Sequence, residues 1–173
     1  MPNATINLRL SLLLLTLLSS ESTAAHHRST KQTSAAVFIG ECLYGQNAAR
    51  ASLGLPPLRW STELAGYADR WLGRLRDGCA MIHSGGDYGE NLFWGGGGGW
   101  TAAQAVAAWV AEAAYYNHWS NACMPNEDCS HYTQVVWRST TLVGCAMVRC
   151  LNGDTLMACE YAPHGNVIGE RPY

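Results

Sequence analysis

The chain has 173 residues, a formal net charge of −2 and a single lysine, Lys31. Nucleic acid is excluded as a working partner, because neutralising phosphates needs a stripe of basic side chains that this composition lacks. Seven cysteines without a Cys-x-x-Cys pair argue against a zinc ribbon and for disulfides in an oxidising compartment, with one thiol left over.

The first residues have the features of an export signal. Arg9 precedes an apolar run of about ten residues that is too short to span a bilayer, and small residues follow up to Ala25. We predict a signal peptide over residues 1–25, a disordered N-terminus over residues 26–36 and one domain over residues 37–173. No later segment has the length and apolar character of a membrane helix, so we expect a secreted protein without a membrane anchor.

Three helices are predicted from apolar periodicity and from turn formers at their ends. They are placed at about 35–52, 61–76 and 101–116. Thr101 and Gln104 have the spacing of a capping box, so the third helix should begin at Thr101. Residues 81–100, which include five consecutive glycines, are predicted to form loops.

The last third of the chain has the alternation of apolar and polar residues that is typical of strands. Strands are predicted at 131–138, 142–150 and 155–162. Asn152-Gly153 between the last two indicates a hairpin with a type I′ turn. Helices first and an antiparallel meander last indicate an α+β fold. In this interpretation His131 opens a strand on its more apolar face, where its imidazole needs a partner.

Two histidines and two carboxylates are candidates for chemistry. Glu112 shares a predicted helix face with Trp109, and a carboxylate there needs a neutral imidazole or a metal as its partner. The four side chains have the donor atoms of a zinc site with an open position: His83, Glu90, Glu112 and His131. No HExxH-type motif joins them, so the residues alone leave ordinary core and surface roles open beside a metal site.

Three separated segments resemble a known family. They are HSGGDYGENLFW (residues 83–94), SHYTQVVW (residues 130–137) and CEYAPHGNVIGERPY (residues 159–173). In this order they resemble the plant pathogenesis-related protein 1 family, within the CAP superfamily of cysteine-rich secretory proteins and wasp antigen 5. The resemblance runs from about Val37 to Tyr173. It implies an α-β-α sandwich with a central antiparallel sheet, and a cleft that carries the two histidines and two glutamates.

The resemblance also implies how the cysteines pair. The expected bridges are Cys79 with Cys150, Cys123 with Cys129, and Cys145 with Cys159. Cys42 stands where the family tends to have a core residue, so we expect a buried free thiol that packs as a small hydrophobe. Three other positions depart from the family pattern: Gln46 replaces a histidine, Ser130 a glycine and Glu160 an asparagine.

The run WGGGGGW, residues 94–100, is no phosphate loop, because no Gly-Lys-Ser/Thr follows the glycines. Its glycines predict a mobile connection, and the apolar surfaces of Phe93, Trp94 and Trp100 flank it. Family members bind sterols near an equivalent loop, which implies that these aromatic residues bind lipid. The alternative, that they only anchor the loop to the core, stays open.

The resemblance implies a plant defence protein of the extracellular fluid, the apoplast, that binds a sterol or another microbial lipid as a monomer and catalyses no reaction. Zinc bound by the four cleft residues would be held weakly and would not be required for the fold. The alternative is a zinc-dependent or histidine-glutamate hydrolase, with Glu90 or Glu112 as base and His83 or His131 as ligand or acid.

The end of the chain matches a further family pattern. Residues 163–173 fit Pro-x-Gly-Asn, five residues and Pro-Tyr, which in the family marks a releasable defence-signalling peptide. The match implies cleavage between Ala162 and Pro163. Proline and glycine disfavour regular structure here and should leave the tail on the surface. A tail that only covers the sheet or packs near the cleft is the alternative.

Overall fold

The structure is a computed structural model that describes residues 32–173, so the predicted signal peptide and residues 26–31 lie outside the described part. The chain divides into two units, Met1–Val37 and Phe38–Tyr173. Residues 32–37 of the first unit are helical. The prediction of disorder is therefore wrong for residues 32–36, where Ala35 and Ala36 are strong helix formers.

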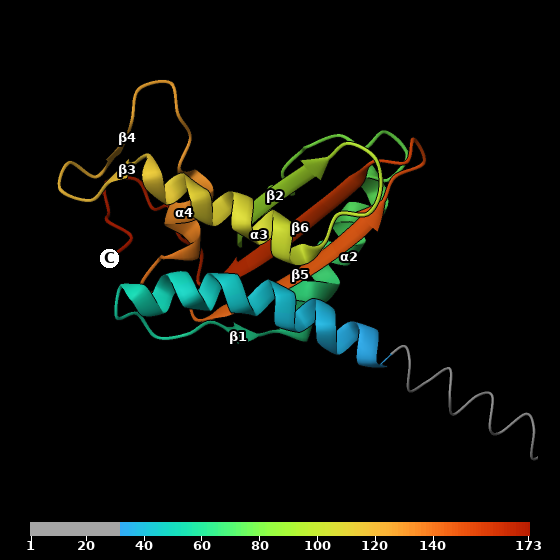
Figure 1. Cartoon of the computed structure of the whole chain (residues 1–173), viewed down its shortest axis with the longest axis horizontal. Helices are drawn as coiled ribbons and strands as arrows, with labels where there is room; N and C mark the ends of the chain where they lie inside the picture. The colour runs from blue at the N-terminus through green and yellow to red at the C-terminus, as the bar shows by residue number, and fades with distance from the viewer. Residues whose placement is uncertain (1–31) are drawn as a thin grey trace, which may run out of the picture. The chain divides into compact units, whose positions relative to one another are not determined.

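The second unit combines a helix over residues 38–52, further helices and a four-stranded sheet (Figure 1). The remaining elements, in chain order, are β1 Arg59–Trp60, α2 Thr62–Leu75, β2 Gly89–Gly95, α3 Ala102–Ala111, a 3-10 turn Glu112–Ala114, β3 Tyr116–Asn117, β4 Ala122–Cys123, α4 Ser130–Val135, β5 Leu142–Arg149 and β6 Thr155–Ala162. The sheet order is β1-β5-β6-β2, in which β5, β6 and β2 are antiparallel and the short β1 is parallel to β5.

Helices cover both faces of this sheet, because β2, β5 and β6 each present apolar residues on both sides. Met157, Cys159 and Tyr161 of β6 pack with α3 and the 38–52 helix. Leu156 and Ala158 of the same strand pack with α2 on the other face. The result is the predicted α+β fold, a sandwich of helices around a central sheet.

Local signals placed the starts of α2 and α3 correctly, but α3 ends at Ala111 and not near residue 116, because a 3-10 turn and β3 follow it. Ser61 caps α2 by accepting a hydrogen bond from the backbone N–H of Leu64 at 3.3 Å. Thr101 and Gln104 form the predicted capping box at the start of α3. A side chain at Gly144 of β5 would lie 2.2 Å from the backbone nitrogen of Ala65, so glycine there allows α2 to approach the sheet closely.

The strand predicted at 131–138 is wrong: the segment forms α4 and then turns. Tyr132, Val135 and Val136 are buried in one cluster, and their spacing of three and four is helical rather than alternating. The Asp128 carboxylate accepts a hydrogen bond from the backbone N–H of Ser130 at 2.8 Å, at the start of the helix. Tertiary packing thus overrides the strand preference of a short β-branched run.

Two other predictions need correction. The loop predicted at 81–100 contains β2, which pairs with β6 along its whole length, from Gly89 to Gly95. Its sequence GENLFWG has glycine at both ends and no alternation of polar and apolar residues, so no local pattern indicates the strand. The β5–β6 hairpin is confirmed, but only Gly153 of its turn has a positive φ, 90°. The turn is therefore a type I turn followed by a left-handed glycine, not type I′.

The cysteines pair in the expected way. Bridges join Cys79 to Cys150, Cys123 to Cys129 and Cys145 to Cys159. Cys42 is free and fully buried, and burial, with a contribution from Glu41, raises the pKa of its thiol to about 12. Within residues 32–173, none of the helices combines the length and the apolar character that crossing a membrane requires.

Candidate functional site

The first histidine of the predicted tetrad lies against a carboxylate of β2. His83 Nδ1 is 2.5 Å from Glu90 Oε1, and both Glu90 oxygens accept from the backbone N–H of Ser84, at 3.1 and 3.2 Å. The Glu90 side chain is 6% exposed, whereas the His83 side chain is 66% exposed. Glu90 therefore anchors the loop before β2 and leaves one imidazole face in solvent.

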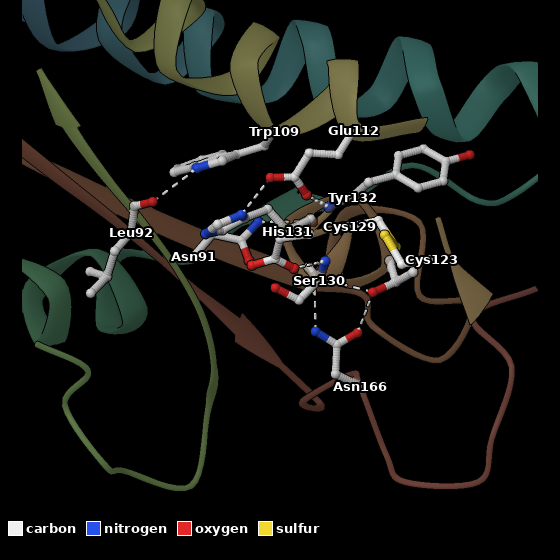
Figure 2. A network of polar contacts seen from close by, with 12 residues as sticks. Asn91, Leu92, Trp109, Glu112, Cys123, Cys129, Ser130, His131, Tyr132 and Asn166 are labelled. Carbon is white, nitrogen blue, oxygen red and sulfur yellow. Dashed lines mark hydrogen bonds and ion pairs between the residues drawn. A yellow bond between two sulfur atoms is a disulfide. The ribbon is translucent and has the colours of Figure 1, made fainter. Parts of the chain in front are cut away.

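The second histidine forms a more enclosed pair (Figure 2). His131 Nδ1 lies 2.6 Å from Glu112 Oε1, and Glu112 Oε2 accepts from the backbone N–H of Tyr132 at 3.0 Å. The imidazole stacks on the Trp109 ring with an interplanar angle of 16°. The partner that the His131 imidazole needs is therefore the carboxylate of Glu112, just past α3.

A hydrogen-bond chain that sequence reasoning missed supports this pair. The Asn91 amide donates to the backbone carbonyl of His131 and to the hydroxyl of Tyr161, which donates to Gln46 Oε1 at 2.9 Å. All three supporting side chains are buried. Gln46, one of the departures from the family pattern, therefore connects the 38–52 helix to the site through hydrogen bonds. The only sequence signal for Asn91 is its place beside Glu90, in a strand that was not predicted.

The two pairs do not combine into one metal centre. Consecutive residues of a strand point to opposite faces, so Glu90 and Asn91 reach different sides of the sheet. Within the described residues, no three histidine, cysteine or acidic side chains come together in a way that could hold a metal ion. Each glutamate is already engaged by an imidazole and by a backbone N–H. The donor set is chemically suitable for zinc, but its arrangement does not fit a four-ligand site, and no step below depends on a metal.

Glu160 is a buried acid beside the first pair. It lies directly opposite Glu90 across β6 and β2, it is fully buried, and neither carboxyl oxygen has a hydrogen-bond partner. Two causes raise the pKa of Glu160 to about 9: burial, which contributes most, and repulsion from the Glu90 carboxylate. Both causes favour the protonated, neutral form of Glu160.

The glycine run makes hydrogen bonds to residues at the start of β6. The Gly97 N–H donates to the Asp154 carboxylate at 2.8 Å, and the Gly97 carbonyl accepts from Thr155 Oγ1 at 3.1 Å. Gly97 and Gly99 have φ values of 71° and 92°, which side chains other than glycine rarely adopt. A side chain at Gly95 would lie 2.4 Å from Trp100 Nε1, so this glycine makes room for the tryptophan.

The three aromatic residues near this loop have different surroundings. Phe93 is half-buried against the core and contacts Trp100 edge to face at 5.2 Å. Trp94 and Trp100 are 46% and 38% exposed. Trp100 lines a groove of about 700 Å³, called here the edge groove, whose walls are Gly98, Gly99, β5 from Cys145 to Arg149, and one face of α2. Phe93 therefore packs on the core, as the alternative to lipid binding predicts, whereas Trp100 lines the edge groove.

A second groove, of about 740 Å³, lies between the 38–52 helix and α3. Most of its lining residues are glycine, alanine or valine, with Glu41 and Tyr44 beside them: Gly40, Gly45, Ala103, Ala107, Val110 and Ala111. We call it the helix groove. It is an alternative place for an apolar ligand.

No nucleophile is aligned with either histidine among the described residues. The Ser84 hydroxyl accepts from the Gly86 N–H, and no hydrogen bond joins the hydroxyl of Ser84 or Ser130 to an imidazole. The His-Glu pairs orient imidazoles and anchor loops, which suits a binding surface.

The chain matches a family model described as the cysteine-rich secretory protein family, CAP, over residues 43–161. It is 51% identical to the pathogenesis-related protein PR-1 of Medicago truncatula over 95% of both chains. It is 46% identical to pathogenesis-related protein 1C of Nicotiana tabacum, over 94% of this chain and 91% of the relative. Among solved structures, that of NaASP2 with Zn²⁺ covers 77% of this chain and 83% of its own, with a TM-score of 0.63 at 23% identity, which supports the fold.

Proposed function

Because the chain belongs to the CAP family, and within it to the plant pathogenesis-related protein 1 group of defence-related proteins, we propose that it is secreted into the apoplast and binds a sterol of an invading microbe as a monomer. It acts by binding and not by catalysis. Neither the family nor these relatives carry a name that indicates catalytic activity. The three disulfides support an oxidising, extracellular compartment.

The observation that carries the lipid proposal is the edge groove with Trp100 at its rim. Its volume of about 700 Å³ lies in the range of ligand pockets, and Met147 and Val148 add apolar surface to its wall. A tryptophan that is 38% exposed still has ring surface to bury against a rigid apolar ligand. Trp94 lies nearby in sequence but is not part of this wall.

We expect that Trp100→Ala weakens cholesterol or ergosterol binding about tenfold or more, because a buried aromatic contact of this size contributes more than about 1.4 kcal/mol. Binding is measured with purified mature protein and radiolabelled sterol. Trp119→Ala is the matched control, since Trp119 is 88% exposed and lies between β3 and β4. Its binding should equal that of the unmodified protein.

Two further variants locate the ligand if it is elsewhere. Ala107→Phe fills the helix groove and should leave sterol binding unchanged if the edge groove is the site. Unchanged binding in Trp100→Ala together with lost binding in Ala107→Phe would move the ligand to the helix groove. Phe93→Ala removes a side chain packed on the core and serves only to check the stability of the fold.

We also propose that residues 163–173 are the precursor of a defence-signalling peptide. The support is the motif match, together with the exposed side chain of Pro163. The carbonyl of Ala162 accepts from the Thr141 N–H at 3.0 Å, and that of Pro163 accepts from Thr140 Oγ1 at 2.8 Å. Cleavage between Ala162 and Pro163 therefore requires local opening of the last strand.

The release prediction is checked in extracellular fluid from stressed tissue. Mass spectrometry should find a peptide that begins at Pro163 and ends at Tyr173. Finding only intact protein, under conditions where a relative with asparagine in place of Glu160 is cut, would end the precursor proposal for this chain.

A further inference from the structure

The C-terminal tail, residues 163–173, is held along its length by a groove of the folded domain. The groove, called here the tail groove, consists of α4, residues 137–140 and the loop between β3 and β4. At the start of the tail, the Gly165 N–H donates to the buried Gln134 side chain at 2.9 Å. Near its end, the Pro172 carbonyl accepts from the Arg138 N–H at 2.6 Å. Both tail residues are buried.

The last residue is the anchor of the tail. The Tyr173 ring stacks on His118 at a centroid distance of 4.6 Å and an angle of 7°, and it meets the Tyr116 ring edge on at 6.2 Å. Its hydroxyl lies 3.5 Å from that of Tyr132. The groove therefore ends in an aromatic box that takes a tyrosine ring.

Three positions of the tail match the groove in a sequence-specific way. A side chain at Gly165 would lie 2.7 Å from the Trp137 ring, so only glycine fits. Asn166 has a φ of 54°, which asparagine tolerates, and its amide donates to the Ser130 carbonyl at 2.9 Å (Figure 2). Arg171 donates to the backbone carbonyls of His118 and Trp119. Ile168, in contrast, is 100% exposed.

All these contacts are non-covalent and lie beyond the Ala162–Pro163 bond. We propose that the tail groove is a peptide-binding site for a segment of the form Pro-x-Gly-Asn…Arg-Pro-Tyr, which holds the tail after that bond is cut and also binds the same peptide in trans. Binding of the cut tail has a role in the plant only if the Ala162–Pro163 bond is cleaved, so this proposal rests on the proposed precursor role. Cutting the chain then yields a domain with the peptide still bound, and dissociation from the groove becomes a separate step of release.

Peptide binding can be tested in the full chain without any cleavage. The double variant Arg171→Ala, Tyr173→Ala should loosen the tail, which hydrogen exchange of the Arg138 amide would show. A fluorescent synthetic peptide of residues 163–173 should then bind saturably to this variant in an anisotropy titration. The unmodified chain should bind the peptide at least about 100-fold more weakly, because its own tail occupies the groove at an effective concentration near millimolar.

Ile168→Ala is the matched control in the same tail and should behave as the unmodified chain. A peptide that carries both alanine substitutions should not bind. If hydrogen exchange of the Arg138 amide is faster in the double variant and the peptide still does not bind to it, the proposal is wrong. Should the double variant fail to fold, Arg171→Ala alone, which removes only exposed hydrogen bonds, allows the same titration.

The two proposals fail separately. Peptide in tissue fluid without binding to the loosened chain refutes the groove and leaves the precursor role. Binding to the loosened chain without any peptide in the fluid refutes the precursor role and leaves the groove.

Discussion

Replacing Arg50 by alanine is expected to destabilise the protein by about 3 to 5 kcal/mol, which is large for one residue. Arg50 is fully buried, and its guanidinium donates four hydrogen bonds to backbone carbonyls. The acceptors are Pro56 at 2.8 Å, Val135 at 3.0 Å, Trp137 at 2.8 Å and Thr140 at 3.0 Å. The variant leaves these buried acceptors without a donor and opens a cavity.

This effect follows from where the four carbonyls lie. They belong to the turn after the 38–52 helix, to the end of α4 and to the segment before β5, so one side chain fixes three parts of the chain. Arg50→Lys should be nearly as harmful, because an ammonium group cannot reproduce the planar fork of donors. Burial also lowers the pKa of the Arg50 guanidinium.

Urea unfolding followed by tryptophan fluorescence would measure the change. Arg70→Ala is the matched control, since Arg70 is exposed on α2, and a change within about 0.5 kcal/mol is expected there. A loss below about 1 kcal/mol in Arg50→Ala would show that water replaces the guanidinium, and that this cluster does not fix α4.

The parts of the fold that sequence predicted are those with local signals. Ser61 and the Thr101–Gln104 box cap helices with partners three residues away, so the pattern alone locates the helix starts. The β5–β6 hairpin is local as well, because Asn152-Gly153 marks its turn. The His-Glu pairs join residues 7 and 19 positions apart. The donor atoms and the family resemblance indicated the four residues, but neither predicted which histidine contacts which glutamate.

The parts that sequence missed depend on distant contacts. Whether residues 130–135 form a helix is decided by packing of Tyr132 and Val135 against Leu55 and by the Arg50 hydrogen bonds, none of which a short window contains. The strand β2 gains its order by pairing with β6, more than fifty residues later in the chain. Missing β2 also meant missing Asn91 as the residue that supports His131.

The environment of Glu160 is the clearest consequence of that missed pairing. A glutamate in a strand-like run predicts a solvent-exposed position, but β2 places Glu90 directly opposite and buries the carboxyl group. We therefore expect Glu160→Gln to stabilise the protein at pH 8 by about 2 to 4 kcal/mol. The amide needs no proton to stay neutral and can donate to the Glu90 carboxylate.

The raised pKa of Glu160 determines the direction in which the free energy of unfolding changes with pH. The pKa of Glu160 is raised to about 9 in the folded protein, above the ordinary value of 4.5 that applies when the chain unfolds. Between these values the folded state holds a proton that the unfolded state releases, so the free energy of unfolding falls as the pH rises. The contribution of protonated Glu160 is complete below about pH 4.5 and is lost as the pH passes through about 9.

Unfolding in urea at pH 5, 7 and 8.5 should therefore show a growing advantage of Glu160→Gln over the unmodified protein. At pH 5 the free energies of unfolding of the variant and the unmodified protein should differ by less than about 1 kcal/mol. At this pH, keeping Glu160 protonated in the folded state costs little free energy. Glu127→Gln, the same substitution at an exposed position, should show no such trend. A constant difference across the three pH values would mean that Glu160 stays ionised in the folded state, with its charge compensated by a cation or solvated by water.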